Sequence, residues 1–323
     1  MTEWVTLIVN LFFLVIGFTL LIKGADFFVD GASKIALKSG IPQIVIGLTV
    51  VAFGTSAPEA AVSLSAAFRG STGIAIGNIL GSNIMNILLI LGLSACVMPL
   101  PVRKSSLNFD IPFVALISVV LAAIGFISGK LDLTAGLILW VFFIVFFVRQ
   151  IMVVKAGKSS GEEVPVLTEK DTFFRIVLIT IAGLAGIIIG SNMTVDGATA
   201  IAQAFGVSDR VIGLTVIAFG TSLPELLTSV TAARKGNPDI AVGNIVGSNI
   251  FNILFVLGTT ALICPVPYGP EFYVDSIVCI LASFFLWFAV FRKGVLGRYA
   301  GVGMLIFYGI YFVYMLASPV IGQ

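Results

Sequence analysis

Two glutamates lie in the middle of long apolar stretches, each at the end of the same short polar motif. The motif reads GTSAPE and ends at Glu59 in the first half of the chain, and it reads GTSLPE and ends at Glu225 in the second. The proline before each glutamate lacks an N–H and clashes with the carbonyl group four residues earlier, so the motif predicts a break in its helix. Each break offers freed backbone oxygens, two hydroxyl groups and one carboxylate within about one helical turn. The hydroxyl groups belong to Thr55 and Ser56 and to Thr221 and Ser222.

A second motif, also present twice, adds neutral oxygen atoms. It reads GNILGSNIMN in the first half and GNIVGSNIFN in the second. Ser82 and Asn86 are four residues apart and share a helix face, as do Ser248 and Asn252. Carbonyl, hydroxyl, amide and carboxylate oxygens together form a ligand set that suits hard cations such as Na⁺ and Ca²⁺. Two carboxylates give the set a formal charge that one Ca²⁺ or two Na⁺ would neutralise.

The composition predicts that these motifs lie in a membrane. Of the 323 residues, 59% are hydrophobic and 11% are charged, and the mean hydropathy is +1.13. About a quarter of the residues are charged in an ordinary soluble domain, so that class is excluded. The net charge of +2 does not suggest a nucleic-acid-binding protein. The chain has no histidine, and the spacing of Cys96, Cys264 and Cys279 suggests buried thiols rather than a metal site.

Apolar runs between charged and turn residues predict an all-α polytopic membrane protein with ten transmembrane helices. An ionisable group inside such a helix is costly and usually functional, so the two glutamates are the first candidates for a site. The predicted segments are 5–30, 42–68, 72–98, 109–128, 131–153, 173–203, 208–233, 239–263, 272–291 and 297–317.

The two halves of the chain are repeats of each other. Glu225 follows Glu59 by 166 residues, and the same offset relates the two GSN motifs without a gap. Matches at Gly, Thr, Ser, Pro, Glu and Asn exceed what two unrelated apolar helices would share, which indicates an internal duplication. The predicted domains are a five-helix repeat at 1–154, a polar cytoplasmic linker at 155–171 and a second five-helix repeat at 172–323.

The distribution of basic residues predicts the orientation. With the amino terminus outside, fourteen of the eighteen lysines and arginines fall on the inner side and three, Arg69, Lys130 and Arg210, on the outer side. This bias favours both termini outside a plasma (inner) membrane that the chain crosses many times. Because each half has an odd number of helices, the halves have opposite orientations. They form an inverted repeat, which is the architecture of many secondary transporters.

These motifs closely resemble the two repeats of the sodium/calcium exchanger family, in the cation/calcium antiporter superfamily, and the resemblance covers essentially the whole chain. It implies a prokaryotic-type antiporter, not an enzyme, that exchanges Na⁺ for Ca²⁺ by alternating access. The first helix of each half would slide against a core made of the others. The resemblance implies no cofactor beyond the transported ions, and the lipid bilayer and the two ions are the expected partners of a monomer that binds no nucleic acid. The metal ligands that it implies are Thr55, Ser56, Glu59, Ser82, Asn86 and the carbonyl of Ala52, with Thr221, Ser222, Glu225, Ser248, Asn252 and the carbonyl of Ala218 in the second half.

The main alternative is an antiporter of the same superfamily for H⁺ and Ca²⁺ or for other cations. Proton-coupled relatives have a different signature around the acidic residue, often with an intramembrane histidine, but Glu59 or Glu225 could still carry protons. Asp30 and Asp196 also repeat, near helix ends, where capping or hydrogen bonding between helices is the expected role. Asp26 aligns with Asn192 and has no acidic equivalent.

Overall fold

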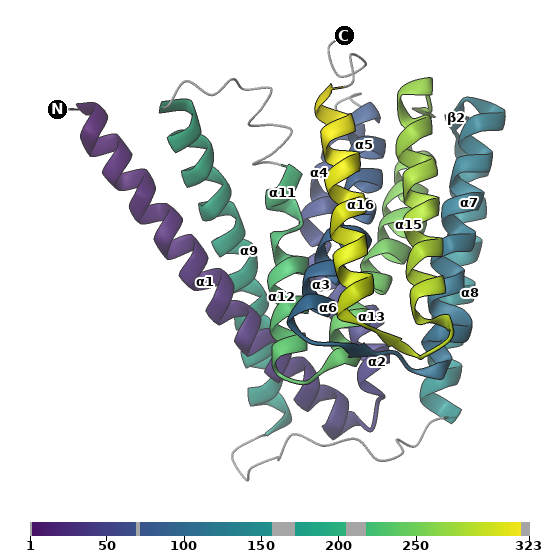
Figure 1. Ribbon diagram of the computed structural model, residues 1–323, viewed down its shortest axis with the longest axis horizontal. Helices are drawn as coiled ribbons and strands as arrows, with labels where there is room; N and C mark the ends of the chain where they lie inside the picture. Colours follow the sequence, from purple (N-terminus) through teal and green to yellow (C-terminus); the bar gives the residue numbers. More distant parts are fainter. Residues whose placement is uncertain (1, 69–71, 157–171, 205–217, 318–323) are drawn as a thin grey trace.

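The computed structural model describes residues 2–68, 72–156, 172–204 and 218–317, which are almost entirely helical (Figure 1). In the first half the elements are α1 (Thr2–Ser39), α2 (Gln43–Ile46), η1 (Gly47–Val51), α3 (Ala52–Thr55), α4 (Ala57–Phe68), α5 (Thr72–Met85), η2 (Asn86–Leu91), α6 (Gly92–Val97), β1 (Leu100–Pro101), η3 (Ser106–Asp110), α7 (Ile111–Ser128), β2 (Lys130–Leu131) and α8 (Leu133–Ala156). In the second half they are α9 (Phe173–Ala204), α11 (Ala218–Thr221), α12 (Leu223–Arg234), α13 (Pro238–Ile250), η5 (Phe251–Leu257), α14 (Gly258–Ile263), β3 (Val266–Pro267), η6 (Pro270–Phe272), α15 (Tyr273–Phe291), β4 (Val295–Leu296) and α16 (Arg298–Ala317).

Each predicted transmembrane segment is helical over most of the residues that the structure describes. By length and hydropathy, seven of the described helices could cross a membrane, and the bent pair Gln43–Thr55 and Ala57–Leu64 makes an eighth. Two predicted segments remain. The segment 208–233 begins outside the described residues and contains α12, and the segment 297–317 contains α16. The first helix is longer than predicted, because the lysines that ended the predicted segment lie within its last turns.

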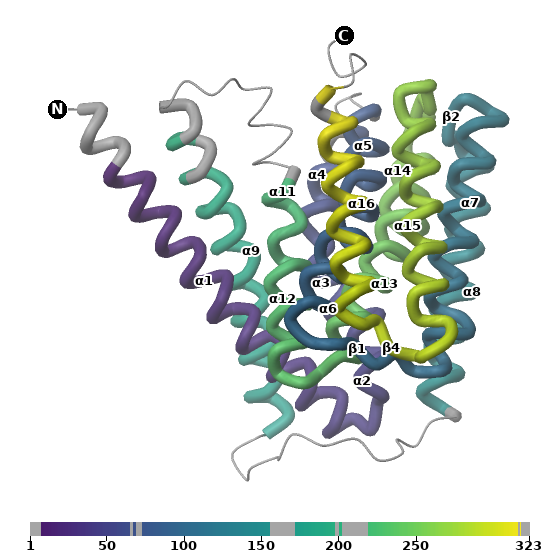
Figure 2. The backbone as a smooth tube through the Cα atoms, in the orientation of Figure 1, coloured from purple at the N-terminus to yellow at the C-terminus, as the bar shows by residue number. Residues whose placement is uncertain are grey.

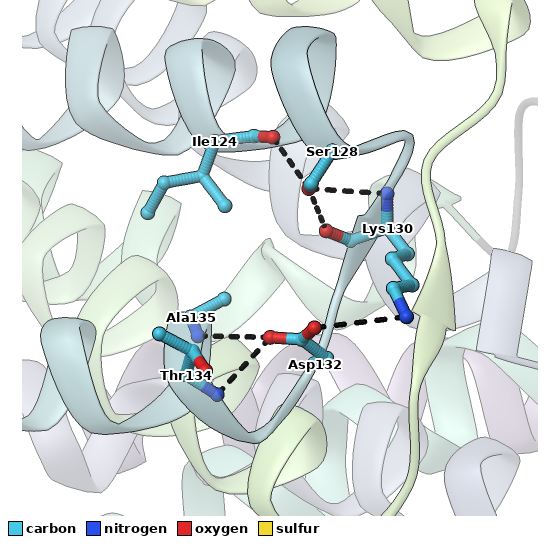
Figure 3. A network of polar contacts seen from close by, with 6 residues as sticks. All are labelled: Ile124, Ser128, Lys130, Asp132, Thr134 and Ala135. Carbon is cyan, nitrogen blue, oxygen red and sulfur yellow. Dashed lines mark hydrogen bonds and ion pairs between the residues drawn. The ribbon is translucent and has the colours of Figure 1, made fainter.

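The arrangement of the helices in space gives the molecule two distinct ends. The helix α1 begins and α16 finishes at one end, called here the terminal face, whereas α8 finishes and α9 begins at the other, called the linker face (Figure 1). The short strands pair between the halves, β1 with β4 at the linker face and β2 with β3 at the terminal face. The terminal-face turn from α7 to α8 is fixed by Asp132, whose carboxylate accepts hydrogen bonds from the backbone N–H groups of Thr134 and Ala135 (Figure 3).

The first helices of the two halves form an antiparallel pair at one side of the molecule (Figure 2). Glycines bring their backbones into contact: a methyl group on Gly24 would lie 2.8 Å from the carbonyl oxygen of Gly183, and one on Gly190 would lie 2.7 Å from that of Gly17. Gly183 and Gly190 are the repeat equivalents of Gly17 and Gly24. The two glycine contacts are therefore equivalent positions of the two repeats, as expected for an inverted repeat.

The helices α5 and α13, which carry the GSN motifs, lie in the interior. Every residue of α13 from Ile240 to Ile250 is buried, and it packs against α2, η1 and α3 of the other half. Wide π-helical turns begin at Asn86 in η2 and at Phe251 in η5. Such turns are frequent at functional sites because they redirect side chains from the regular helical path.

Candidate cation-binding site

Both predicted helix breaks are present, and they lie two residues before the prolines. The helix α3 ends at Thr55 and α4 begins at Ala57, with a bend of 47° between the two parts. The second break is at Ser222, between α11 and α12. Pro58 and Pro224 occupy the first turns of the new helices, where an N–H has no intrahelical partner to lose.

The breaks place the two glutamates in the first turns of α4 and α12, where the helix dipole favours a negative charge. Glu59 is 1% exposed and Glu225 is wholly buried. Each carboxylate accepts a hydrogen bond from the serine at the break of the other half. Ser56 donates to Oε1 of Glu225 at 2.8 Å, and Ser222 donates to Oε1 of Glu59 at 3.3 Å.

The remaining hydroxyl groups of the motifs join this centre. Ser222 lies 3.4 Å from the hydroxyl oxygen of Ser82. The hydroxyl of Ser248 is 3.5 Å from Oε1 of Glu225 and 3.4 Å from the carbonyl oxygen of Ala52. Thr55 lies 3.3 Å from the same carbonyl oxygen. The Ala52 carbonyl, which also accepts the backbone N–H of Ser56 at 3.0 Å, therefore lies beside hydroxyl groups from both halves.

A second layer of asparagines fixes the orientation of the motif amides. Asn86 donates from Nδ2 to Oδ1 of Asn249 at 3.0 Å, and Asn252 donates in the same way to Oδ1 of Asn83 at 3.1 Å. All four residues are buried. The amide nitrogens of Asn86 and Asn252 are used in these hydrogen bonds. Their amide oxygens make no hydrogen bond to the second layer.

Four buried oxygen atoms in this region have no hydrogen-bond partner. They are Oε2 of Glu59, Oε2 of Glu225, Oδ1 of Asn86 and Oδ1 of Asn252. Buried acceptors are normally satisfied, so four at duplicated positions require an explanation. A set of four oxygens of which two carry charge is the environment that a hard cation would satisfy. The described residues contain no group of three or more His, Cys, Asp or Glu side chains that could hold a metal ion, so a cation here would depend on neutral oxygens as well as on the two carboxylates.

Most of the predicted ligand set is thus gathered in one place. Thr55, Ser56, Glu59, Ser82, Ser222, Glu225 and Ser248 are joined by the contacts above, and Asn86 and Asn252 lie one helical turn beyond Ser82 and Ser248. Thr221 ends α11 and lines a crevice of about 590 Å³ that reaches the α4 break. Ala218 begins α11, and its side chain lies outside the described residues.

Six polar residues that support the site were not among the predicted ligands. Asn78 donates to the carbonyl of Glu59 and to Ser63. Asn244 does the same for Glu225 and Ser229, and it also accepts a hydrogen bond from Thr55 at 2.9 Å. A signal for these residues was present in the sequence, because Asn78, Asn83 and Ser63 all recur at the offset of 166 residues.

The comparisons with known proteins agree with this geometry. A family model described as sodium/calcium exchanger protein matches residues 9–152 and 175–317. The chain belongs to the sodium/calcium exchanger family. This confirms the resemblance seen in the motifs, and it makes the protein a cation/calcium exchanger-family transporter rather than an enzyme.

Members of the family are similar over nearly the whole length. Inner membrane protein YrbG of Escherichia coli is 40% identical over 91% of this chain and 92% of its own. Sodium/calcium exchanger MaX1 of Methanosarcina acetivorans is 32% identical over 93% of this chain and 96% of its own. A structure of the sodium-calcium exchanger NCX_Mj, soaked with Na⁺ and Sr²⁺, covers 95% of this chain and 98% of its own with a TM-score of 0.83 at 34% identity. A second, soaked with Na⁺ and Ca²⁺, has the same TM-score. The predicted all-helical fold with two repeats is confirmed.

Proposed function

We propose that this protein is a secondary antiporter that exchanges Na⁺ for Ca²⁺ across the membrane by alternating access. The observation that carries the proposal is the set of four partnerless oxygens at the centre, contributed by Glu59, Glu225, Asn86 and Asn252. Two carboxylates in an enclosed, apolar surrounding need about two positive charges to offset their desolvation. One Ca²⁺ or two Na⁺ supply the same charge, so the two ions would compete for one place.

The proposed ligands are the twelve residues that the resemblance to the family implies. The neutral members, hydroxyl and amide oxygens, would replace the water molecules that the ion loses on entry. Relatives give independent support for these ions, because MaX1 is named a sodium/calcium exchanger and NCX_Mj has been soaked with Na⁺ and with Ca²⁺ or Sr²⁺. We also propose that the chain acts as a monomer, since both half-sites belong to one polypeptide.

We further propose that the terminal face lies outside the plasma membrane and the linker face in the cytoplasm. The described basic residues gather at elements of the linker face: α1 ends there with Lys38, α8 with Lys155, and α12 with Arg234. This is the distribution that the positive-inside rule associates with a cytoplasmic side. YrbG, a similar protein, is named an inner membrane protein.

Uptake of ⁴⁵Ca²⁺ into proteoliposomes loaded with Na⁺ tests the exchange directly. We expect uptake when the external solution lacks Na⁺, and little uptake when Na⁺ is equal on both sides. A proton-coupled relative would instead take up Ca²⁺ under a pH gradient at equal Na⁺. That result would replace Na⁺ by H⁺ as the driving ion and leave the candidate site unchanged.

A further inference from the structure

The duplicated crevice beside the site is open on one face of the molecule and closed on the other. On the terminal face it lies between α4 and α9, has a volume of about 590 Å³, and reaches Pro58 and Thr221 at the helix breaks. Its polar lining on α9 includes Asn192 and Asp196. This crevice gives the candidate site a route toward the terminal face.

The equivalent positions on the linker face are packed. Val62, in the open crevice, is 40% exposed, whereas its repeat equivalent Thr228 on α12 is 0% exposed. Val195 on α9 lines the open crevice, whereas its equivalent Val29 on α1 is fully buried. The same sequence repeat therefore adopts two states in one molecule, with α9 standing away from α4 and α1 closed onto α12.

A lysine joins the two helices at the mouth of the closed side. Lys235 directly follows α12, and its Nζ donates to a carboxylate oxygen of Asp30 at 2.9 Å and to the backbone carbonyl of Asp26 at 2.8 Å. It also lies 3.3 Å from the Asp26 carboxylate. The backbone of Lys235 is held by a hydrogen bond to Thr231, and the chain then turns at Gly236, whose φ is 72°. The amine is therefore fixed to the core, while all three of its acceptors belong to α1.

We infer that Lys235 is a positioning residue that latches the linker-face half of α1 to α12, and that this contact must open before the candidate site can be reached from the linker face. The inference rests on the proposed alternating-access function. All three acceptors lie within one helical turn, so a small sliding movement of α1 would break the three contacts together. The carboxylates of Asp26 and Asp30 are 40% and 57% exposed, which makes the latch weak enough to open in each cycle.

Cysteine labelling in nanodiscs, where both faces are open to solvent, tests the latch without measuring transport. In a variant whose three native cysteines are replaced by alanine, a single Thr228→Cys reports the closed side and a single Val62→Cys reports the open side. With Lys235 intact, we expect a polar thiol reagent to modify Val62→Cys rapidly and Thr228→Cys slowly. Adding Lys235→Gln should raise the labelling rate of Thr228→Cys by about two- to fivefold, the population shift expected from losing an exposed ion pair.

The matched control is Lys235→Arg, which keeps the positive charge and should keep labelling of Thr228→Cys slow. An unchanged thermal unfolding temperature of the Gln variant would show that the protein remains folded, because unfolding would itself expose Thr228→Cys. If Lys235→Gln does not yield folded protein, Asp30→Asn removes the negative charge of the shorter ion pair and should raise the labelling rate in the same way. An unchanged Thr228→Cys rate in a folded Gln or Asn variant would overturn the latch. Because labelling needs no ion flux, the latch can fail while Na⁺/Ca²⁺ exchange stands, and exchange can fail while the latch stands.

Discussion

Asn83 and Asn249 hold each other across the centre of the protein. Each donates from its side-chain amide to the backbone carbonyl oxygen of the other, and both distances are 3.2 Å. Their own amide oxygens then accept from the motif residues Asn252 and Asn86. This reciprocal pair links the two halves and determines which way the proposed amide ligands face. A metal site depends on such second-layer contacts nearly as much as on its ligands.

Replacing Asn83 by alanine should therefore weaken cation binding although Asn83 is not a proposed ligand. The change removes the acceptor that holds Asn252, so the Asn252 amide could rotate and present N–H groups toward the cation. Loss of a second-layer partner typically costs about 10–100-fold in metal affinity. Equilibrium ⁴⁵Ca²⁺ binding to purified protein in detergent measures this affinity. Ser283→Ala, which removes a buried hydroxyl that bonds only within α15, is the control and should bind normally.

Glu59→Gln and Glu225→Gln should each abolish coupled Ca²⁺ transport while the protein still inserts and folds. Glutamine keeps the shape of the side chain and can still accept the serine hydrogen bonds, so the loss is mainly one of charge. A single remaining carboxylate is too little to offset the desolvation of a divalent ion. Na⁺-driven ⁴⁵Ca²⁺ uptake into proteoliposomes checks this. Wild-type rates in both single variants would mean that the transported ion binds elsewhere.

The sequence was sufficient to predict the helix breaks, the two carboxylates and the hydroxyl groups around them. It could do so because Gly, Pro and Glu are unusual in apolar helices and because they occur twice. It did not separate the roles of Asn83 and Asn86, since both are asparagines of one motif and only packing decides which amide faces the centre. The length of α1 was underestimated for a related reason: Lys34 and Lys38 end an apolar run but are compatible with a helix.

The state of the crevices could not be predicted at all. The duplicated motifs specify the same local structure twice, so the motifs themselves do not say which of the two equivalent crevices is open. The difference between Val62 and Thr228 arises from how α1 and α9 sit against the core. Asp30 was expected either to cap a helix or to form a hydrogen bond between helices. It forms a hydrogen bond between helices, with Lys235.

The glycine contact between α1 and α9 should tolerate no larger side chain. Gly24→Leu would place its side chain against the backbone of Gly183 and Ile187, where even a methyl group would be within 2.8 Å of the nearest atoms. Overpacking of this kind typically costs about 1–3 kcal/mol, so we expect a lower unfolding temperature and slower exchange. Thermal unfolding in detergent measures the first effect. Gly309→Ala in α16 is the control, because a methyl group there would meet nothing within 4 Å.

An unchanged unfolding temperature in Gly24→Leu would show that the two helices can separate at no cost. In that case α1 and α9 would not move together as a pair, contrary to what their backbone contacts indicate.

The basic residues predict that residue 160, which lies outside the described residues, is cytoplasmic. A single Ser160→Cys in a variant lacking the native cysteines should resist impermeant thiol reagents added to intact cells and should react after the cells are permeabilised. A single Cys in place of Lys130, the first residue of β2 at the terminal face, should show the opposite behaviour. Ready labelling of Ser160→Cys from outside would reverse the orientation and leave the geometry of the site unaffected.

Transport should need Na⁺ and be independent of K⁺, because Asn86 and Asn252 are both neutral. The site then has two carboxylates and no third, so it lacks an extra charge that could accept a K⁺ or a proton. The decisive measurement is Na⁺-driven Ca²⁺ flux with K⁺ either present or wholly replaced by an organic cation, and we expect the same rate in both. In Asn252→Asp, a third carboxylate in a desolvated site would bind protons in competition with cations, so flux should fall more steeply as the pH is lowered. A strict K⁺ requirement in the unmodified protein would contradict the ligand set proposed here, since it would call for a charge that Glu59 and Glu225 alone do not supply.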